Sequence, residues 1–387
     1  MDPIYLDYAA TTPVREEVRS AMDPYLGDVF GNPSSIHRWG RRAQAALEEA
    51  RSTLAEALGA RRREILFVRG GTESDNLAIL GRVDADRRAG RPTRVVTTAV
   101  EHKAVLDAAR AAEADCTVLP VDPGGAVHES ALEGALAEGA SVLSAMWVNN
   151  EVGTVQPMER IVTLAQEYGV PVHTDAVQAV GKIPVHVDRV PVALLSLTGH
   201  KLYGPKSAGA LFVREGVALA ARLHGGSQEG GLRPGTQDVA GAVGLATAVR
   251  LAVDEQGEFA RTRRALREEL EARLRSGIPG LVVHGLEGVR APHILSIGIP
   301  RVDPELLQVS LDMEGLAVSG GSACSSGETS MSHVLEAMLS DGTPPAVVRY
   351  SLGRTTSRDD VLRAAEVTLS VVARLTSSAR MSGSDVR

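Results

Sequence analysis

The sequence predicts an α/β protein with a mostly parallel sheet flanked by helices, together with a smaller α+β domain. From about residue 43 to residue 250, helical and strand-like segments alternate, which is typical of a parallel sheet covered on both faces. After about residue 256 this alternation ends. We therefore predict a large domain of residues 16–256 and a small domain of residues 1–15 and 257–387.

The alternating region is expected to begin with a helix, because residues 44–58 carry apolar side chains at helical spacing. Further helices are expected after Gly70-Gly71-Thr72 and from Glu101-His102. Short apolar and β-branched runs predict strands at residues 64–68, 94–98, 117–121, 141–148, 170–173, 192–197 and 208–213.

The small domain opens with a long charged helix, predicted over residues 258–275. Shorter strands are predicted at residues 281–284, 293–299 and 347–352. A final helix is predicted over residues 359–375. Strands and helices in this order indicate an α+β arrangement.

The composition is that of an ordinary globular protein, with 44% hydrophobic and 23% charged residues. The net charge of −7 argues against a general nucleic-acid binder, whose surface is basic. Two cysteines require no disulfide framework, and no signal peptide or run of about 18 apolar residues is visible. These features predict a cytoplasmic protein with no membrane contact, and we predict no metal site.

Polar side chains follow one predicted strand after another, at the point where each strand ends. They are Thr72, His102, Asn150, Asp175 and Lys201. In an open α/β sheet, ligands bind beyond the carboxyl ends of the strands. The sequence therefore predicts a binding site at this edge of the sheet.

Lys201 and Asp175 have the residue types that an aldehyde cofactor with a pyridine ring requires. Lys201 closes an apolar strand among glycines, where its amine could form a Schiff base, or could instead snorkel to solvent. Asp175 could face a protonated ring nitrogen, or could cap a following helix. Gln178 lies three residues on and shares a face with Asp175 if a helix begins there, so Gln178 or Asn150 could reach the ring's phenolic oxygen.

Gly70-Gly71-Thr72 joins a strand to a helix, and backbone N–H groups at a helix N-terminus bind phosphate well. A tight glycine turn with a threonine cap is the alternative. The segment lacks the spacings of dinucleotide-binding and P-loop motifs. His102 could stack on an aromatic ring or shuttle a proton, and its structural alternative is a helix start.

The two cysteines differ in their surroundings. Cys324 lies among small and polar residues in VSGGSACSSGETS, where an exposed thiol is a candidate nucleophile. Cys116 precedes a strand-like run and is expected to be buried. Arg349 could clamp a substrate carboxylate with two hydrogen bonds, with Arg354 as the alternative clamp and a surface salt bridge as the structural explanation.

Together these residues resemble those of the cysteine desulfurases, a branch of the class-V aminotransferases with the type I pyridoxal-phosphate (PLP) fold. The resemblance covers essentially the whole chain in order. Its motifs are YLDYAATTP, FGNPSS, TESDN, AVEHKAV, VNNEVGT, HTDAVQ, TGHKLYGPKSAGAL, RPGTQDV, SGGSACSSG and VRYSLGR. The length of the segment around the cysteine resembles the branch with an extended cysteine loop.

The resemblance implies a role for each matching residue. Lys201 would bind the cofactor covalently, Cys324 would carry a persulfide, and Thr236 would reach the phosphate in the neighbouring subunit of a homodimer. The other implied roles are ring stacking for His102, the pyridinium contact for Asp175, the phenolic oxygen for Asn150 and Gln178, the phosphate for Gly71, Thr72, Thr198 and His200, and the substrate carboxylate for Asn32 and Arg349.

The implied reaction converts L-cysteine to L-alanine and passes the sulfur to a protein acceptor, such as an iron–sulfur scaffold or a tRNA thiolation enzyme. No direct binding of nucleic acid is expected. Three rival functions remain at this point: aminotransfer on the same fold, selenocysteine cleavage, and a binding protein that has kept the fold without the chemistry.

Overall fold

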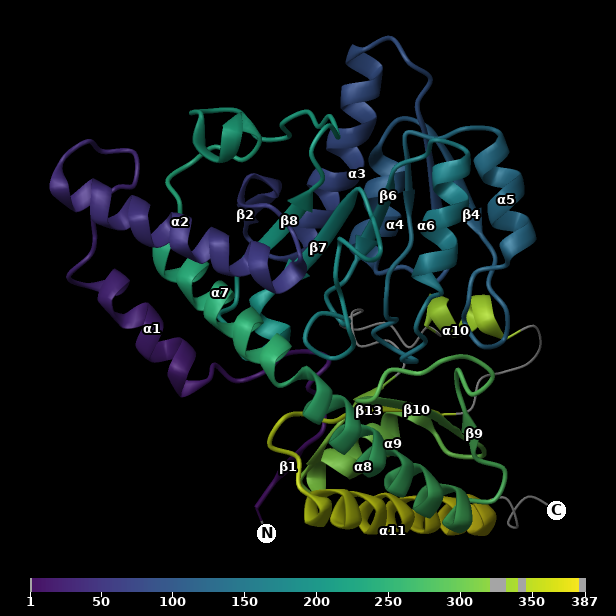
Figure 1. Ribbon diagram of the computed structural model, residues 1–387. Helices are drawn as coiled ribbons and strands as arrows, with labels where there is room; N and C mark the ends of the chain where they lie inside the picture. The colour runs from purple at the N-terminus through teal and green to yellow at the C-terminus, as the bar shows by residue number, and fades with distance from the viewer. Residues whose placement is uncertain (1, 321–331, 340–345, 383–387) are drawn as a thin grey trace.

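Two hydrophobic cores organise the computed structural model, one above the other in Figure 1. The structure describes residues 2–320, 332–339 and 346–382. The larger core surrounds a seven-stranded sheet, and the smaller core surrounds a four-stranded sheet.

The large sheet is mostly parallel, as the sequence predicts. Its five strands from β7 to β4 run parallel to one another, and β8 is antiparallel to both of its neighbours. In spatial order the strands are β2 (Ile65–Val68), β8 (Gly209–Val213), β7 (Leu194–Thr198), β6 (Val172–Asp175), β5 (Val142–Ser144), β3 (Arg94–Thr98) and β4 (Asp115–Leu119).

Helices cover both faces of this sheet, so successive strand residues are buried on opposite sides. Val95 packs against α3 (Gly71–Arg88) and α4 (Lys103–Ala111), whereas Val96 packs into the larger core on the other face. The helices of that other face are α2 (Arg38–Leu58), α5 (Glu129–Ala137), α6 (Met158–Glu167) and α7 (Val239–Asp254), and α1 (Glu16–Leu26) packs against α7. Burial on both faces explains why the strands read as continuous apolar runs.

The smaller core lies below the large sheet in Figure 1 and contains an antiparallel sheet. The chain's N-terminus joins this core through β1 (Ile4–Tyr5), which pairs with β11 (Leu316–Ala317). The sheet strands are β12 (Ser319–Gly320), β13 (Ala346–Ser351), β10 (Ile294–Ile299) and β9 (Val282–Val283), and the helices are α8 (Gln256–Gly277), α9 (Pro304–Met313) and α11 (Arg358–Ser382).

Short elements complete the chain. The 3-10 turns are η1 (Arg62–Glu64), η2 (Gly199–Lys201) and η3 (Gln228–Gly231), and helix α10 spans His333–Met338. The two cores support the predicted division near residue 256, where α7 ends and α8 begins, but that division stays a prediction. In the described ranges, no helix is long and apolar enough to cross a membrane.

Three local predictions are wrong. The strand expected over residues 141–148 ends at Ser144, because the Met146 N–H bonds to the Glu101 side chain instead of a neighbouring strand. Helix α2 begins at Arg38, six residues before the predicted start, after a cap by His37. Cys116 is exposed rather than buried, because β4 is the edge strand of the sheet.

Candidate functional site

A cavity of about 290 Å³ lies at the carboxyl ends of the parallel strands. Its volume is close to the lower end of small-molecule sites, which range from about 300 to 1,000 Å³. Ten of the predicted site residues line it together: Gly71, Thr72, His102, Asn150, Asp175, Gln178, Thr198, His200, Lys201 and Arg349. These residues are far apart in the sequence, and the sheet brings them to one edge.

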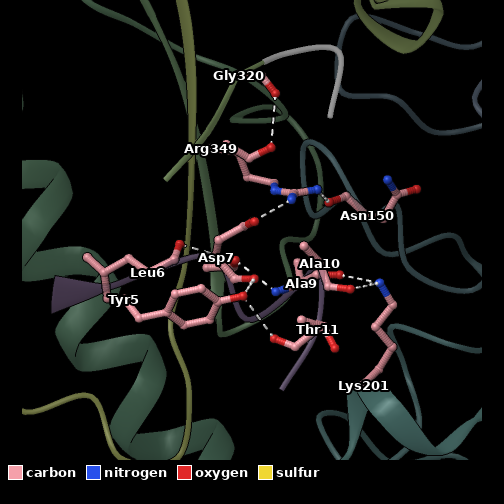
Figure 2. A network of polar contacts seen from close by, with 12 residues as sticks. Tyr5, Leu6, Asp7, Ala9, Ala10, Thr11, Asn150, Lys201, Gly320 and Arg349 are labelled. Atoms are coloured by element: carbon pink, nitrogen blue, oxygen red, sulfur yellow. Dashed lines mark hydrogen bonds and ion pairs between the residues drawn. The ribbon is translucent and has the colours of Figure 1, made fainter. Parts of the chain in front are cut away.

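Lys201 reaches the cavity from η2, the turn that directly follows β7. Its amine donates hydrogen bonds to the backbone oxygens of Ala9, at 2.7 Å, and Ala10, at 2.6 Å. Figure 2 shows the segment Asp7 to Thr11 lying between this amine and the guanidinium of Arg349. The N-terminal segment therefore forms one wall of the site.

Asp175 ends β6, and its side chain is fixed by a hydrogen bond that the Val177 N–H donates to Oδ1 at 2.9 Å. The residues that follow form turns rather than a helix, so Asp175 caps no helix. Gln178 still reaches the site from these turns, where its Nε2 donates to Ala9 O at 2.9 Å. Both side chains are buried.

Two further buried carboxyl groups surround Asp175. Burial raises the pKa of Asp75 well above its usual value, and the neighbouring charge of Asp175 adds to this effect. Burial also raises the pKa of Glu101 to about 8, although its Oε1 accepts hydrogen bonds from Met146 N and Thr98 Oγ1. The pKa of Asp175 is raised by burial as well. The charges of His102 and Lys201 act in the opposite direction and lower the pKa of Asp175, and a further cation in the cavity would stabilise its charged form.

The N-terminus of α3 provides backbone donors at the cavity. Gly70 precedes the helix with φ of 118°, a conformation that glycine adopts without strain, and Gly71 and Thr72 form the first turn. Thr198 donates its hydroxyl proton to Ala208 O at 3.1 Å. Burial, reinforced by nearby lysines, lowers the pKa of His200 to about 4, so its ring is neutral near neutral pH.

His102 is the N-cap of α4, as its structural interpretation predicts. Its Nδ1 accepts a hydrogen bond from Ala104 N at 3.1 Å, which fixes the ring while one side of it lines the cavity. The structural and functional interpretations of His102 are therefore compatible.

Arg349 lies in the cavity wall, whereas Arg354 is exposed and lines a separate cavity. The Arg349 guanidinium donates from Nη1 to Asn150 O at 2.8 Å and from Nη2 to Asp7 Oδ1 at 2.7 Å (Figure 2). Its buried Nε has no hydrogen-bond partner among the described residues. Arg349 is buried and its Nε is left without a partner, so a surface salt bridge is the wrong explanation for this residue.

Three predicted residues are not brought to this cavity within one chain. Asn32 is exposed in the connection between α1 and α2, where its Oδ1 accepts from Ser34 N. Thr236 is exposed between η3 and α7. Neither lines the cavity, so Asn32 does not meet Arg349 as the predicted carboxylate pair would require. Cys324 lies outside the described residues.

The sequence interpretation missed three acidic residues in or next to the site. Asp7 pairs with Arg349, and Asp75 and Glu101 lie near Asp175. Asp75 and Glu101 lie close in sequence to the predicted site residues Thr72 and His102, so their sequence position could have indicated that they lie near the site. Asp7 carried no local signal, because its partner is 342 residues away.

A model of the class-V aminotransferase family matches residues 4–363. The chain belongs to this family. Within the family, a cysteine desulfurase IscS from Dictyoglomus turgidum is 42% identical over 380 residues, which cover 96% of this chain and 94% of the relative. A cysteine desulfurase NifS from Azotobacter vinelandii is 40% identical over 382 residues, which cover 97% and 94%.

Solved structures confirm the class-V aminotransferase fold. A NifS-like protein matches with a TM-score of 0.89 and 33% identity, covering 96% of this chain and 100% of that structure. A structure described as SspA in complex with cysteine matches with a TM-score of 0.78 and 33% identity, covering 90% and 98%. The type I PLP fold predicted from the resemblance is thus confirmed.

Proposed function

We propose that the protein is a PLP-dependent cysteine desulfurase, which converts L-cysteine to L-alanine and keeps the sulfur as a persulfide on Cys324. The observation that carries this proposal is the convergence of the Lys201 amine, the Asp175 carboxyl and the Arg349 guanidinium on one cavity. Relatives named cysteine desulfurase at 40% and 42% identity support the reaction.

The described residues fit PLP at three points. The Asp175 carboxyl is buried and its pKa is raised by that burial, so a pyridinium beside it would stabilise its charged form. The first turn of α3 presents backbone N–H groups, and Thr72, Thr198 and His200 line the same cavity, where they could hold a phosphate. Lys201 also lines the cavity, and its amine could bind the cofactor aldehyde.

The chemistry that PLP supplies when bound is an electron sink for the substrate Cα, which a carboxylate facing the ring nitrogen maintains. Asp175 would be that carboxylate, and its fixed Oδ1 orients the group. His102 would lie against the ring, and Asn150 and Gln178 would contact its phenolic oxygen. Lys201 would hold the cofactor through its amine, and the same amine would be the base for the substrate Cα proton.

Arg349 would bind the substrate carboxylate. Its guanidinium is already oriented by Asp7 and the Asn150 carbonyl, and its unpartnered Nε offers a buried donor. A charged donor that is buried without a partner is costly, so an entering carboxylate gains a strong hydrogen bond. This favours Arg349 over the exposed Arg354 as the clamp.

Cys324 would take the sulfur. It follows Ser319 by five residues in the sequence, and the strand partner of Ser319 is Arg349, the proposed carboxylate clamp. Its thiolate would attack the substrate sulfur, so that an S–S bond forms and the substrate Cβ–S bond breaks. The electron pair of the broken bond stays with the substrate carbon skeleton, which regains protons and leaves as alanine.

The test is to incubate the purified protein with L-cysteine, to trap persulfide on Cys324 and to measure alanine. Cys324→Ser should lose persulfide and sulfur transfer, whereas Cys116→Ser should keep both. Normal rates in Cys324→Ser would contradict the sulfur step. Separately, Lys201→Ala should lose the visible absorbance of the lysine-bound cofactor, and retained absorbance would contradict that assignment. Consumption of a keto acid instead of alanine release would favour aminotransfer.

We further propose a homodimer that hands its sulfur to an acceptor protein. Large apolar side chains are exposed at Leu26, Phe30, Ile36 and Trp39, around the connection between α1 and α2. Exposed apolar groups gathered in one region are typical of protein interfaces. Thr236 and Asn32 are both exposed and free to approach a second subunit. Light scattering on the purified protein tests the dimer.

A further inference from the structure

His293 lies beside the smaller core but contacts Gln178, which lines the proposed cofactor cavity. It directly precedes β10, and its backbone oxygen accepts from Leu352 N at 2.8 Å. Its ring is fully buried and packs against the ring of Phe259 in α8, with ring centroids 6.0 Å apart. The Nε2 of this ring lies 3.5 Å from the Oε1 of Gln178, a long hydrogen bond that joins the small sheet to the wall of the cavity.

The hydrogen bonds of Gln178 determine which ring nitrogen of His293 carries the proton. The Ala9 carbonyl can only accept, so the amide nitrogen of Gln178 is the group that faces it, at 2.9 Å. The Oε1 of Gln178 therefore faces His293 and needs a donor. A neutral imidazole supplies that donor only when its proton is on Nε2.

The ring of His293 is neutral, so it has one proton to donate. Burial lowers its pKa well below the usual value, and the positive charges of Lys182, Arg267 and Arg349 add to this effect. With the proton on Nε2, Nδ1 is an acceptor, and it has no protein partner among the described residues. His293 also lines a second cavity of about 30 Å³, which has room for a water molecule. A water that donates to Nδ1 would favour the same tautomer.

This tautomer holds the Gln178 amide in one orientation. An amide nitrogen carries two protons, and one of them is donated to Ala9 O. The other can be donated to an acceptor in the cavity that Gln178 lines. If the amide were reversed, its oxygen would face the Ala9 carbonyl and its nitrogen would face the protonated ring nitrogen, so acceptor would meet acceptor and donor would meet donor. His293 therefore favours the orientation that offers a donor to the cavity.

A role in packing alone is the alternative, and His284 is an example of it. His284 directly follows β9 and is also buried, and burial lowers its pKa to about 4. Its Nδ1 lies 2.9 Å from Ser296 Oγ, and its Nε2 has no partner in the described part of the chain. Neither His284 nor Ser296 lines the proposed cofactor cavity. The contact with a cavity residue is what distinguishes His293.

We propose that His293 is a positioning residue of the cofactor site: its Nε2–H donates to the Gln178 Oε1 and so directs an amide N–H of Gln178 toward the phenolic oxygen of the cofactor. This inference rests on the proposed function, since it assumes that PLP occupies the cavity. His293 acts only through Gln178 and does not touch the cofactor.

The experiment measures the pH at which the visible absorbance of the PLP-loaded protein changes, together with the dissociation constant for PLP. A hydrogen bond to the phenolic oxygen stabilises its anionic form, so loss of that bond should raise the pH at which the lysine-bound cofactor gives up its proton. We expect His293→Leu, which removes the donor, to raise this midpoint by about half a pH unit or more and to weaken PLP binding severalfold. His293→Gln should stay close to the wild type, because its amide can donate to Gln178 in place of the ring.

Two controls separate positioning from packing. His284→Leu removes a buried neutral histidine beside the same sheet, and it should lower stability toward urea while leaving the midpoint unchanged. In a Gln178→Met background, His293→Leu should not move the midpoint further, because its effect passes through the amide. His293→Met, which also lacks a donor, takes the place of His293→Leu if that protein does not fold.

Three results would overturn the proposal: an unchanged midpoint in His293→Leu, an equal shift in His284→Leu, or a further full shift when His293→Leu is added to Gln178→Met. A His293→Gln protein that behaves like His293→Leu would also overturn it. A wild-type protein that takes up no PLP would instead contradict the proposed function, and with it the acceptor assumed for Gln178.

Discussion

Glu101→Gln is expected to change how the stability of the cofactor-free protein depends on pH. Glu101 is fully buried, and its pKa is raised from 4.5 to about 8. The folded protein therefore holds a proton on this carboxyl that the unfolded chain gives up at lower pH. Stability from this group is fully present below pH 4.5 and is lost as the pH rises to about 8. A glutamine has no such proton to lose.

The size of the effect follows from these two pKa values. Each pH unit between them changes the free energy of unfolding by about 1.4 kcal/mol. Including the partial titration at both ends, the stability of Glu101→Gln relative to the wild type should rise by about 3 kcal/mol between pH 5 and pH 7.5. The glutamine Oε1 can still accept from Met146 N and Thr98 Oγ1, while its amide replaces the unpartnered Oε2. That unpaired amide lowers the free energy of unfolding by about 1–3 kcal/mol at every pH. It therefore shifts the plot of stability against pH without changing its slope.

The assay is urea unfolding of both proteins without cofactor, followed by circular dichroism at several pH values from 5 to 8.5. Glu167→Gln, which changes an exposed carboxyl, serves as the control and should run parallel to the wild type. If the difference between Glu101→Gln and the wild type is the same at pH 5 and pH 7.5, Glu101 is not held as a buried neutral acid and the reasoning is refuted.

Three further predictions concern Arg349, Gly209 and Cys116. Arg349→Lys should lower kcat/KM for L-cysteine by about 30-fold or more, because it loses a charged hydrogen bond worth about 2 kcal/mol or more. Arg354→Lys should change kcat/KM little, and equal effects of the two substitutions in steady-state assays would reject Arg349 as the clamp. Gly209→Ala should weaken PLP binding, since the new Cβ would lie 2.6 Å from the Gly70 Cα and push the start of α3 away; an unchanged dissociation constant in absorbance titration would contradict this. The Cys116 thiol should react with a thiol reagent in the native protein, because it is exposed, and protection until unfolding would disprove that exposure.

Much of the large sheet could be predicted from the sequence because its signals are local. The strand β3 coincides with its predicted range, and β2 and β8 differ from theirs by one residue. Strands buried on both faces produce apolar runs that need no knowledge of their neighbours. The strand predicted over residues 141–148 ends early because the Met146 N–H bonds to the Glu101 side chain, and hydrophobicity does not distinguish that from strand pairing.

The candidate site was also largely predictable, for a topological reason. Residues that directly follow parallel strands meet at one edge of the sheet, so Asp175 and Lys201 could be expected together without coordinates. Gln178 lines the same cavity although the helix assumed for it is absent, since turns bring it there.

By itself, the sequence determined the chemical inventory of this protein: a lysine, a carboxylate and phosphate-binding glycines at successive strand ends, and a thiol in a polar segment. Only the tertiary structure decided which side chains are buried and which distant residues pair. It paired Asp7 with Arg349, buried Glu101, and left Cys116 exposed at a sheet edge. The physical reason is that periodicity and strand ends are encoded over a few residues, whereas burial and long-range pairing depend on how whole layers pack.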